Sequence, residues 1–162
     1  MTENIVIRRM KAEDLDAALD QVIRLKRLNA EFDSIFNVAE ESKSDFRDHL
    51  NEALSDGDRY IVLVAEAGSK VVGLVKVDIH TRLYYKPKYE ARIVEFYVMP
   101  EYRRKNTGKL LMDELYRILK ERKIRLITAE FPSLNLIALG FYKGIGYREV
   151  VSVYGKMIED DE

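Results

Sequence analysis

The sequence predicts a single α/β domain, in which helices pack on the faces of a mixed β-sheet. Two observations predict this class. The chain has 162 residues, the usual length of one domain. A hairpin region is followed by two strand–helix–strand units, an order typical of a mixed sheet rather than a doubly wound parallel one. We therefore expect one domain over residues 1–162.

The first 55 residues predict one strand and two helices. β-Branched residues between positions 4 and 10 favour a strand. From Leu15 onward, apolar residues recur every three or four positions, which indicates a long amphipathic helix. Ser42 and Asp45 have the spacing of a helix start, where the Ser42 hydroxyl can accept a hydrogen bond from a free amide.

The middle of the chain predicts a β-hairpin. Residues 60–67 and 71–80 are joined by a short turn at Gly68. In the second strand, apolar residues alternate with Lys76, Asp78 and His80, so we expect only one dry face.

The remaining elements alternate between strand and helix. The patterns predict strands at 92–99, 125–131 and 147–158, and helices at 107–122 and 135–143. Pro100 ends the first of these strands because it has no amide to continue a ladder. The expected order is strand, two helices, three strands, helix, strand, helix, strand.

Composition excludes several classes of function. The net charge is -1 and the pI is about 6.2, so no global positive field would gather nucleic acid or an anionic membrane. No apolar run approaches the roughly 18 residues that span a bilayer, and we expect a cytoplasmic protein. Without cysteine there is no disulfide, thiolate ligand or cysteinyl acyl-enzyme. His49 and His80 lack metal-ligand spacing, so we expect no metal.

A basic turn at residues 98–109 is the first informative motif. It carries Arg103, Arg104, Lys105 and Lys109 into the start of a predicted helix, where unpaired amides and the helix dipole favour an anion. A P-loop is excluded, since Arg103 takes the place of its first glycine and Leu110 that of its hydroxyl residue.

The second motif begins at Asn135. Asn135 and Tyr142 are seven residues apart, which places them on one helical face about 10 Å apart along the axis. They could contact one extended ligand. Alternatively, Asn135 is a helix cap and Tyr142 a core aromatic before the Gly146 turn.

Together the two motifs resemble those of the GNAT superfamily of N-acetyltransferases. The basic turn is similar to the acetyl-CoA loop, Arg/Gln-x-x-Gly-x-Gly/Ala, with Arg103 and Gly108 in place but Asn106 where a glycine is usual. Asparagine tolerates a left-handed backbone, so the turn can still form. The second motif matches Asn-x-x-Ala-x-x-Phe/Tyr-Tyr-x-x-x-Gly-Phe/Tyr throughout. The resemblance covers most of the chain from Tyr60 onward, and the first 55 residues in outline.

The resemblance implies a mostly antiparallel, splayed sheet and direct transfer of acetyl from acetyl-CoA to a primary amine, without a covalent intermediate. The amine would be a small molecule, a polyamine, or a peptide or protein amino group, and the chain a monomer or homodimer. The residues implied to hold acetyl-CoA are Phe96, Tyr97 and Val98 by their backbone, Arg103, Arg104, Lys105, Asn106, Thr107, Gly108, Lys109, Asn135 and Tyr142.

The resemblance also assigns catalytic roles. Tyr142 would donate a proton to the leaving thiolate, and Glu95 or Glu130 would deprotonate the amine, although either glutamate could instead be a salt-bridged structural residue. We expect the acceptor to lie against the first two helices, their connection near residues 32–36, and Tyr84–Tyr85. Acidic side chains there would favour a cationic amine or form a solvated face; they are Glu31, Asp33, Glu40 and Glu41.

Two other functions stay open at this point. A regulatory GNAT-like module would bind acyl-CoA without turnover, and a plain interaction domain would have no CoA site. The basic turn and Tyr142 favour the enzyme over the second of these.

Overall fold

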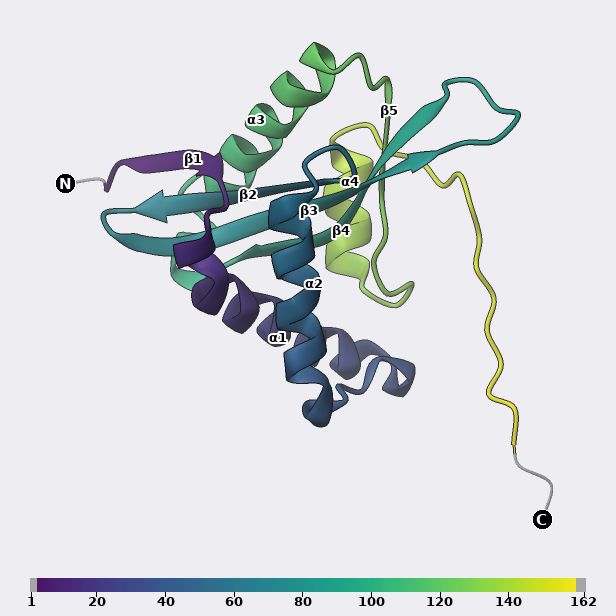
Figure 1. Cartoon of the computed structure of the whole chain (residues 1–162). Helices are drawn as coiled ribbons and strands as arrows, with labels where there is room; N and C mark the ends of the chain where they lie inside the picture. The colour runs from purple at the N-terminus through teal and green to yellow at the C-terminus, as the bar shows by residue number, and fades with distance from the viewer. Residues whose placement is uncertain (1–2, 160–162) are drawn as a thin grey trace.

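The computed structural model describes residues 3–159 and is built around a five-stranded sheet. The strands are β1 (Ile5–Arg9), β2 (Tyr60–Ala67), β3 (Lys70–Thr81), β4 (Tyr89–Val98) and β5 (Leu126–Ala129), in the spatial order β1-β2-β3-β4-β5 (Figure 1). The first four strands pair antiparallel, and β5 runs parallel to β4. The mixed, mostly antiparallel sheet predicted from the sequence is therefore confirmed.

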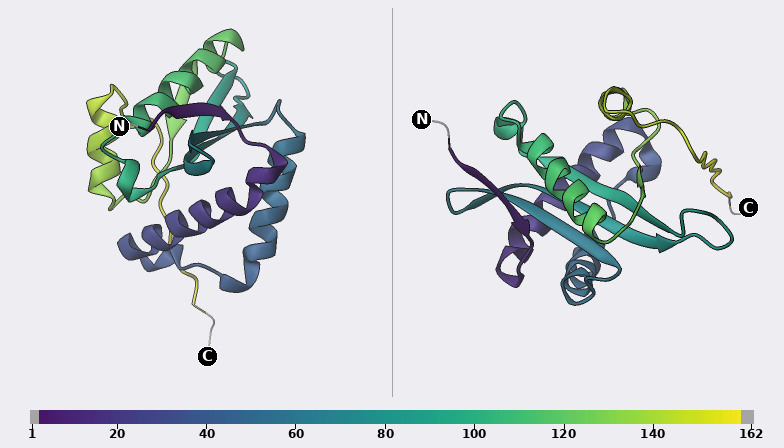
Figure 2. Two further views of the ribbon diagram at one scale, coloured as in Figure 1. Left: turned by 90° about the vertical axis from the view of Figure 1, so that its left-hand side faces the viewer. Right: turned by 90° about the horizontal axis from the view of Figure 1, so that it is seen from above.

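Two helices cover each face of the sheet (Figure 2). Helices α1 (Leu15–Phe32) and α2 (Lys43–Ser55) lie on one face, and α3 (Thr107–Glu121) and α4 (Leu136–Gly144) on the other. Short 3-10 turns precede α1, connect α1 to α2 and lead into α3. Among residues 3–159, no helix combines the length and apolar character needed to cross a bilayer.

Strand β2 is at the centre of two separate cores. Ile61 and Leu63 pack in the cluster that contains Leu111 and Leu115 of α3, whereas Val62 and Val64 pack in the cluster that contains residues of α1 and α2. Because successive side chains point to opposite faces, a strand between two helix layers is buried on both. This explains why β2 has a nearly continuous apolar sequence.

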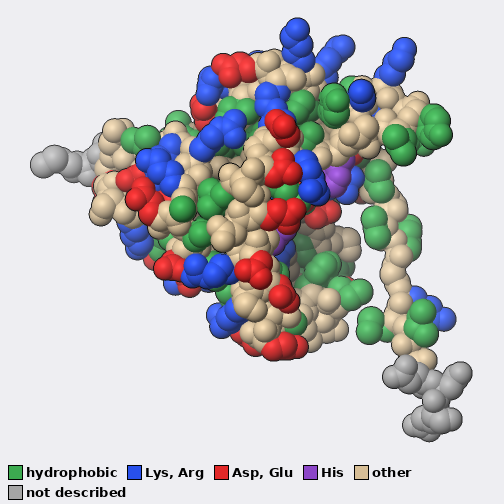
Figure 3. Space-filling view, viewed as in Figure 1, with side chains coloured by type: hydrophobic (Ala, Val, Ile, Leu, Met, Phe, Trp, Pro, Cys, Tyr) green, Lys and Arg blue, Asp and Glu red, His purple; other side chains and the backbone are tan. Residues whose placement is uncertain are grey.

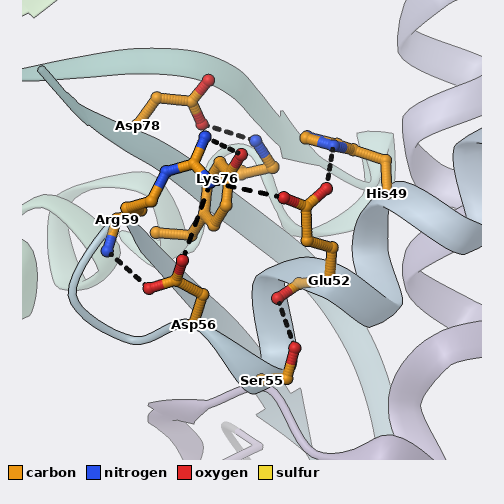
Figure 4. Close-up of polar contacts among 8 residues, drawn as sticks. His49, Glu52, Ser55, Asp56, Arg59, Lys76 and Asp78 are labelled. Carbon is orange, nitrogen blue, oxygen red and sulfur yellow. Dashed lines mark hydrogen bonds and ion pairs between the residues drawn. The ribbon is translucent and has the colours of Figure 1, made fainter.

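The expectation of a single dry face on β3 is wrong. Lys76, on the face expected to be wet, is only 2% exposed because the α1–α2 layer covers that face. Its ammonium group is 2.5 Å from Asp78 Oδ1 and 4.8 Å from the centre of the Tyr60 ring, in the polar cluster that joins α2 to the sheet (Figure 4). Alternation alone could not distinguish a solvated lysine from a buried, paired one.

A β-bulge at Val94 ends the pairing between β4 and β5. In the β3–β4 register, Lys76 lies opposite Glu95 and Val77 opposite Ile93, so Val94 is the extra residue. The β4–β5 ladder runs only from Glu90 to Ile93 on β4, and its last bond is from Glu130 N to Ile93 O, at 3.1 Å. A bulge bends its strand and increases the local twist. Within residues 3–159, the edge of β4 that faced β5 therefore has no partner strand from Val94 to Val98.

The final strand expected at residues 147–158 is absent, and this prediction is wrong. That stretch contains no strand, and residues 148–158 make no backbone–backbone hydrogen bond to another described residue. β-Propensity reflects packing on a sheet more than an intrinsic backbone preference, so a strand-like sequence without a pairing edge stays irregular. The Ser42 cap is also not formed, since the Ser42 hydroxyl accepts no hydrogen bond from a backbone amide at the start of α2.

Candidate active site

The basic turn lies between β4 and α3, directly after the unpaired end of β4. A 3-10 turn at Pro100–Tyr102 reverses the chain, and Asn106 then forms the N-cap of α3 with φ 66° and ψ 7°. This left-handed conformation is the one for which asparagine is the best substitute for glycine. The expectation that Asn106 preserves the turn is confirmed for the backbone.

The start of α3 presents several free amides. Leu110 N donates to Asn106 O, but the amides of residues 106–109 make no backbone hydrogen bond within residues 3–159. Thr107 is completely buried at the first position of α3, and its Oγ1 has no partner among the described residues. A helix start with unpaired amides and an orphaned hydroxyl has the donors that an anion requires.

The basic side chains of the turn divide into two groups. Arg103 points back to β4, where its Nε donates to Val98 O at 2.8 Å and its guanidinium lies over the Tyr97 ring. Lys105 lies over the Tyr102 ring, and Lys109 pairs with Asp113 one helical turn on. Arg104 is exposed and has no salt bridge to any other described residue. Arg103 thus stabilises the turn itself, and the others keep positive charge around the helix start.

Gly108 allows α3 to approach the sheet closely. A Cβ at this position would be 3.3 Å from Phe96 Cζ, tighter than most contacts that real Cβ atoms make. The absence of a side chain at Gly108 therefore permits contact between α3 and the unpaired end of β4.

A chain of aromatic rings connects β4 to α4. Phe96 stacks on Phe141 with ring centres 5.9 Å apart, and Phe141 meets the edge of Tyr142 at 5.1 Å. Tyr142 also stacks on Phe131 and contacts Tyr147. These contacts bring the two sequence motifs together, because Phe96 also touches the position of Gly108.

Tyr142 is 7% exposed, so it is a core aromatic as well as a candidate catalytic residue. Its hydroxyl makes no hydrogen bond to a described residue, yet it is not among the fully buried orphan atoms, which are Gln21 Oε1, Glu95 Oε2 and Thr107 Oγ1. Burial, and then the neighbouring Tyr116, raise the pKa of the Tyr142 phenol well above its usual value. The hydroxyl therefore stays protonated at neutral pH and can donate a hydrogen bond.

Asn135 is the N-cap of α4, as the structural alternative proposed. Its Oδ1 accepts a hydrogen bond from Ala138 N at 3.1 Å. Because the side-chain carbonyl is used in this way, its NH₂ group is the part that remains available to a ligand.

The two candidate bases differ in burial. Glu95 lies on the α1 side of β4, is 9% exposed, and its Oε1 is 2.5 Å from Lys26 Nζ of α1, while its Oε2 is buried without a partner among the described residues. Burial raises the pKa of Glu95, and the attraction of Lys26 opposes that rise only in part. Glu130 is exposed directly after β5, close enough that its charge also raises the pKa of Glu95.

The acidic residues expected around the acceptor are partly engaged. Glu40 pairs with Arg27 and Lys43, which lower its pKa, and Asp33 accepts a hydrogen bond from Ile35 N. Glu31 and Glu41 carry no salt bridge to another described residue. All four side chains are exposed, so both alternatives, a solvated face and an attraction for a cationic amine, stay predictions.

Sequence reasoning did not find Lys26, Tyr116 or Phe131. Lys26 is a charged residue on a long amphipathic helix and carries no motif, and its pairing with Glu95 depends on how α1 crosses the sheet. Tyr116 hydrogen-bonds Tyr147 at 3.0 Å between hydroxyl oxygens, a contact between residues far apart in sequence. No local signal could have indicated either contact.

Two further features define what the site lacks and where cavities lie. In the described part of the chain, no three His, Cys, Asp or Glu side chains gather so that they could hold a metal ion. A surface concavity of about 540 Å³ is lined by Glu3, Val6 and Gly68 at the β1 edge of the sheet. Glu3 also accepts a hydrogen bond from the Tyr102 hydroxyl of the basic turn, at 2.6 Å.

Comparison with known proteins gives one family and many structures of the same fold. The model of the acetyltransferase (GNAT) family matches residues 25–147. An uncharacterized N-acetyltransferase of Methanocaldococcus jannaschii is 25% identical over 161 residues, which cover 98% of this chain and 68% of that protein.

Two solved structures illustrate the likeness of fold. The aminoglycoside N-acetyltransferase AAC(6')-Iy in complex with CoA has a TM-score of 0.78 at 15% identity, over 98% of this chain and 97% of the other. A predicted acetyltransferase with acetyl-CoA from Clostridium acetobutylicum has a TM-score of 0.75 at 15% identity, over 95% and 96%.

Proposed function

The chain belongs to the acetyltransferase (GNAT) family and is an acetyl-CoA-dependent N-acetyltransferase, and we propose that it transfers acetyl directly to a primary amine at the unpaired end of β4. One observation carries this proposal. The β4–β5 ladder stops at Ile93, and the unpaired half of β4 leads straight into the basic turn and the free amides of α3. The thioester arm of acetyl-CoA would thus lie along the strand edge, and its diphosphate would bind next to that edge, at the start of α3.

The start of α3 would hold the diphosphate. Its donors are the free amides of residues 106–109, with the buried Thr107 hydroxyl among them. Arg104, Lys105 and Lys109 add positive charge, while the helix dipole favours a phosphate at this end. The fit is supported by the left-handed Asn106, which turns the chain so that these amides follow one another into the helix.

The unpaired edge of β4 would hold the pantetheine arm in the manner of an added strand. The backbone of Phe96, Tyr97 and Val98 supplies the groups for such pairing. The Val98 carbonyl already accepts from Arg103, so this end of the strand is kept in place by the turn that holds the diphosphate. Asn135, at the start of α4, would add an amide donor on the opposite side.

Acetyl-CoA supplies the acetyl thioester, and the chain's own residues provide proton transfer. The ammonium form of the acceptor must first lose a proton, which we assign to Glu95 acting directly or through water. The amine nitrogen then bonds to the acetyl carbon while the carbon–sulfur bond breaks. Tyr142 donates a hydrogen bond to the departing sulfur, and the overall products are the acetamide, the free thiol and one proton.

Glu95 is favoured over Glu130 because it has an unused oxygen in a buried place. Its Oε1 pairs with Lys26, whereas Oε2 has no partner among the described residues. A cationic acceptor could take the position beside Oε2 or replace Lys26 there. Such an acceptor would relieve the cost of a buried, unsatisfied carboxylate oxygen. We therefore propose a cationic primary amine as the acceptor. The candidates to test are polyamines, aminoglycosides and peptide amino groups.

Two measurements test the proposed function. Acetyl-CoA should raise the thermal midpoint, since a ligand at 100 times its Kd stabilises a protein by about 2.7 kcal/mol. A panel of polyamines, aminoglycosides and peptide amines, followed by thiol release, should then identify the acceptor. Stabilisation without turnover on any amine would favour the regulatory module, and no stabilisation would contradict the acetyl-CoA site itself.

A Tyr142→Phe variant tests the acid. We expect kcat to fall by about 10²–10⁴-fold, the usual contribution of a positioned proton donor, while the thermal shift with acetyl-CoA changes little. The phenylalanine keeps the stacking on Phe131 and Phe141, so folding should be preserved. Unchanged turnover would remove Tyr142 from the mechanism.

A further inference from the structure

Lys26 is the cation that neutralises Glu95 in the separate chain. Its Nζ is 2.5 Å from Glu95 Oε1, and Glu95 makes no salt bridge to any other residue of the described chain. Lys76 lies opposite Glu95 on β3, but its ammonium group is paired with Asp78, at 2.5 Å. Because Glu95 is only 9% exposed, its charge depends on one lysine rather than on water.

The Val94 bulge turns Glu95 toward this lysine. Ile93 packs in the core that contains α3, and a regular strand would place the residue two positions on at the same face. The extra residue instead puts Glu95 in register with Lys76, on the face that α1 and α2 cover. Bulges next to active sites often re-aim a side chain in this way. The bulge therefore brings the carboxylate to α1 at the point where the edge of β4 loses β5.

Lys26 reaches Glu95 from the surface of the protein. The Lys26 side chain is 29% exposed, whereas that of Glu95 is 11% exposed. A lysine carries its compact ammonium group on a flexible four-carbon stem, so this stem connects solvent with a buried carboxylate. A primary ammonium on an unbranched alkyl arm would fit the same path after the lysine side chain had moved out into water.

Lys26 satisfies only half of the carboxylate. Glu95 Oε2 is buried and has no hydrogen-bond partner among the described residues. A primary ammonium has three N–H donors, and one that is not attached to α1 can turn them toward both carboxylate oxygens. A free ligand can therefore make the hydrogen bond that Lys26 leaves unmade.

We propose that Lys26 is a tethered competitor of the acceptor: it occupies an ammonium site at Glu95, and an acceptor with a primary ammonium on an unbranched alkyl arm takes its place. The inference rests on the proposed function, in which Glu95 is the base. The exchange replaces one cation by another, so the buried carboxylate always has a partner. An amine that is neutral in solution, such as aniline, would leave the buried charge unpaired if it displaced Lys26. Lys26 thus selects cationic acceptors.

The rest of the surface offers little selection of this kind. On the face of the molecule in Figure 3, acidic and basic side chains are interspersed. The net charge of -1 also gives little overall attraction for a cation. Selection of a cationic acceptor therefore depends on the local pair of Glu95 and Lys26.

Lys26→Ala tests the ammonium site without turnover. The variant keeps Cβ, and propylammonium supplies the three carbons and the nitrogen that the substitution removes. In mildly alkaline buffer, propylammonium chloride at 100 times its Kd should raise the thermal midpoint of this variant by about 5–10 °C and leave the wild type nearly unchanged. Tetramethylammonium chloride, which has the charge but no N–H donor, should stabilise neither protein.

Arg27→Ala is the matched control variant. It removes a positive charge from the next position of α1, where Arg27 pairs with Glu40 and not with Glu95. It should respond to propylammonium as the wild type does. If Lys26→Ala folds only in the presence of a cation, its recovery in propylammonium but not in tetramethylammonium would be the supporting result.

Kinetics separate the competitor from a merely structural lysine. With acetyl-CoA, Lys26→Ala should acetylate propylamine with a KM about tenfold or more below that of the wild type, because the tethered ammonium is gone. Lys26 and Lys76 lower the pKa of Glu95, and Glu130 raises it. Loss of the Lys26 charge in Lys26→Gln should therefore move the acid limb of kcat/KM to higher pH, and Lys26→Arg should keep the limb in place.

The outcomes distinguish this inference from the proposed function. Equal stabilisation of the wild type and Lys26→Ala by propylammonium, or an acid limb that does not move in Lys26→Gln, would overturn the inference. Stabilisation of Lys26→Ala by propylammonium without acetyl transfer to any amine would support the ammonium site and contradict the proposed function. Acetyl transfer with the same propylamine KM in the wild type and Lys26→Ala would support the proposed function and overturn the competitor.

Discussion

Burial distinguishes the two candidate bases, Glu95 and Glu130. Both are glutamates, and each lies a few residues before one of the two sequence motifs. Glu95 is enclosed between β4 and α1, whereas Glu130 is exposed after β5. A carboxylate is less stable when it is removed from water, so burial raises the pKa of Glu95. A raised pKa makes a stronger base, and this is the property that deprotonation of an amine requires.

The pH dependence of the reaction should identify the base. Because the base acts when deprotonated, kcat/KM should fall as the pH drops through the raised pKa of Glu95, above the 4.3 or so of an ordinary glutamate. In Glu95→Gln, we expect kcat/KM to fall by about 10²–10⁴-fold and this acid limb to disappear.

Glu130→Gln is the matched control. It should keep the acid limb and move it to lower pH, because the Glu130 charge is one of the causes that raise the pKa of Glu95. If the acid limb of kcat/KM disappeared in Glu130→Gln and persisted in Glu95→Gln, Glu130 would be the base instead of Glu95.

Among the elements, the start of α3 depends on a single backbone conformation. Asn106 has a left-handed φ of 66°, which most side chains adopt only at a cost of about 1–2 kcal/mol. This conformation leads the chain into α3, so that the free amides of residues 106–109 lie together at the start of the helix. The sequence departure from glycine is thus compatible with the turn.

Substitutions at Asn106 should separate conformation from chemistry. Asn106→Gly should keep both the unfolding free energy, within a few tenths of a kcal/mol, and the thermal shift with acetyl-CoA. Asn106→Val should lose about 1–2 kcal/mol in urea unfolding and show a smaller acetyl-CoA shift, since a β-branched residue fits the left-handed region poorly. Equal behaviour of the two variants would show that the turn does not need this conformation.

Elements with an apolar period were predictable, but where strand pairing stops was not; the one pairing read directly from the sequence was the β2–β3 hairpin. The helices α1, α3 and α4 and the strands β1 to β5 lie within a few residues of their predicted bounds. The period of the side chains is local information. The Val94 bulge is different, because it arises where β4 must follow β3 on one side and leave β5 on the other.

For the whole molecule, the sheet separates the interior into two cores. One contains Leu115 of α3 and the other Leu50 of α2, and each of these side chains is at most 3% exposed. The two clusters share no residue, although both depend on β2. Their contributions to stability should therefore be independent at the level of side chains.

A double-mutant cycle checks this independence. Leu115→Ala and Leu50→Ala should each lower the unfolding free energy by about 2–5 kcal/mol in urea denaturation. The double variant should equal the sum within about 0.5 kcal/mol, because the sites lie on opposite faces without shared neighbours. A coupling well above that value would mean that the sheet transmits packing changes between its faces.

The sequence alone determined the order of strands and helices from β1 to α4, the basic turn at the start of α3 and the motif that carries Tyr142, because these depend on local periods and spacings. Only the tertiary structure decided that Lys76 is buried, that Lys26 pairs with Glu95, and that residues 147–158 have no partner strand in their own chain. The physical reason is the same in each case: burial, ion pairing and strand pairing need a second segment, and its position is a property of the packed sheet and helices.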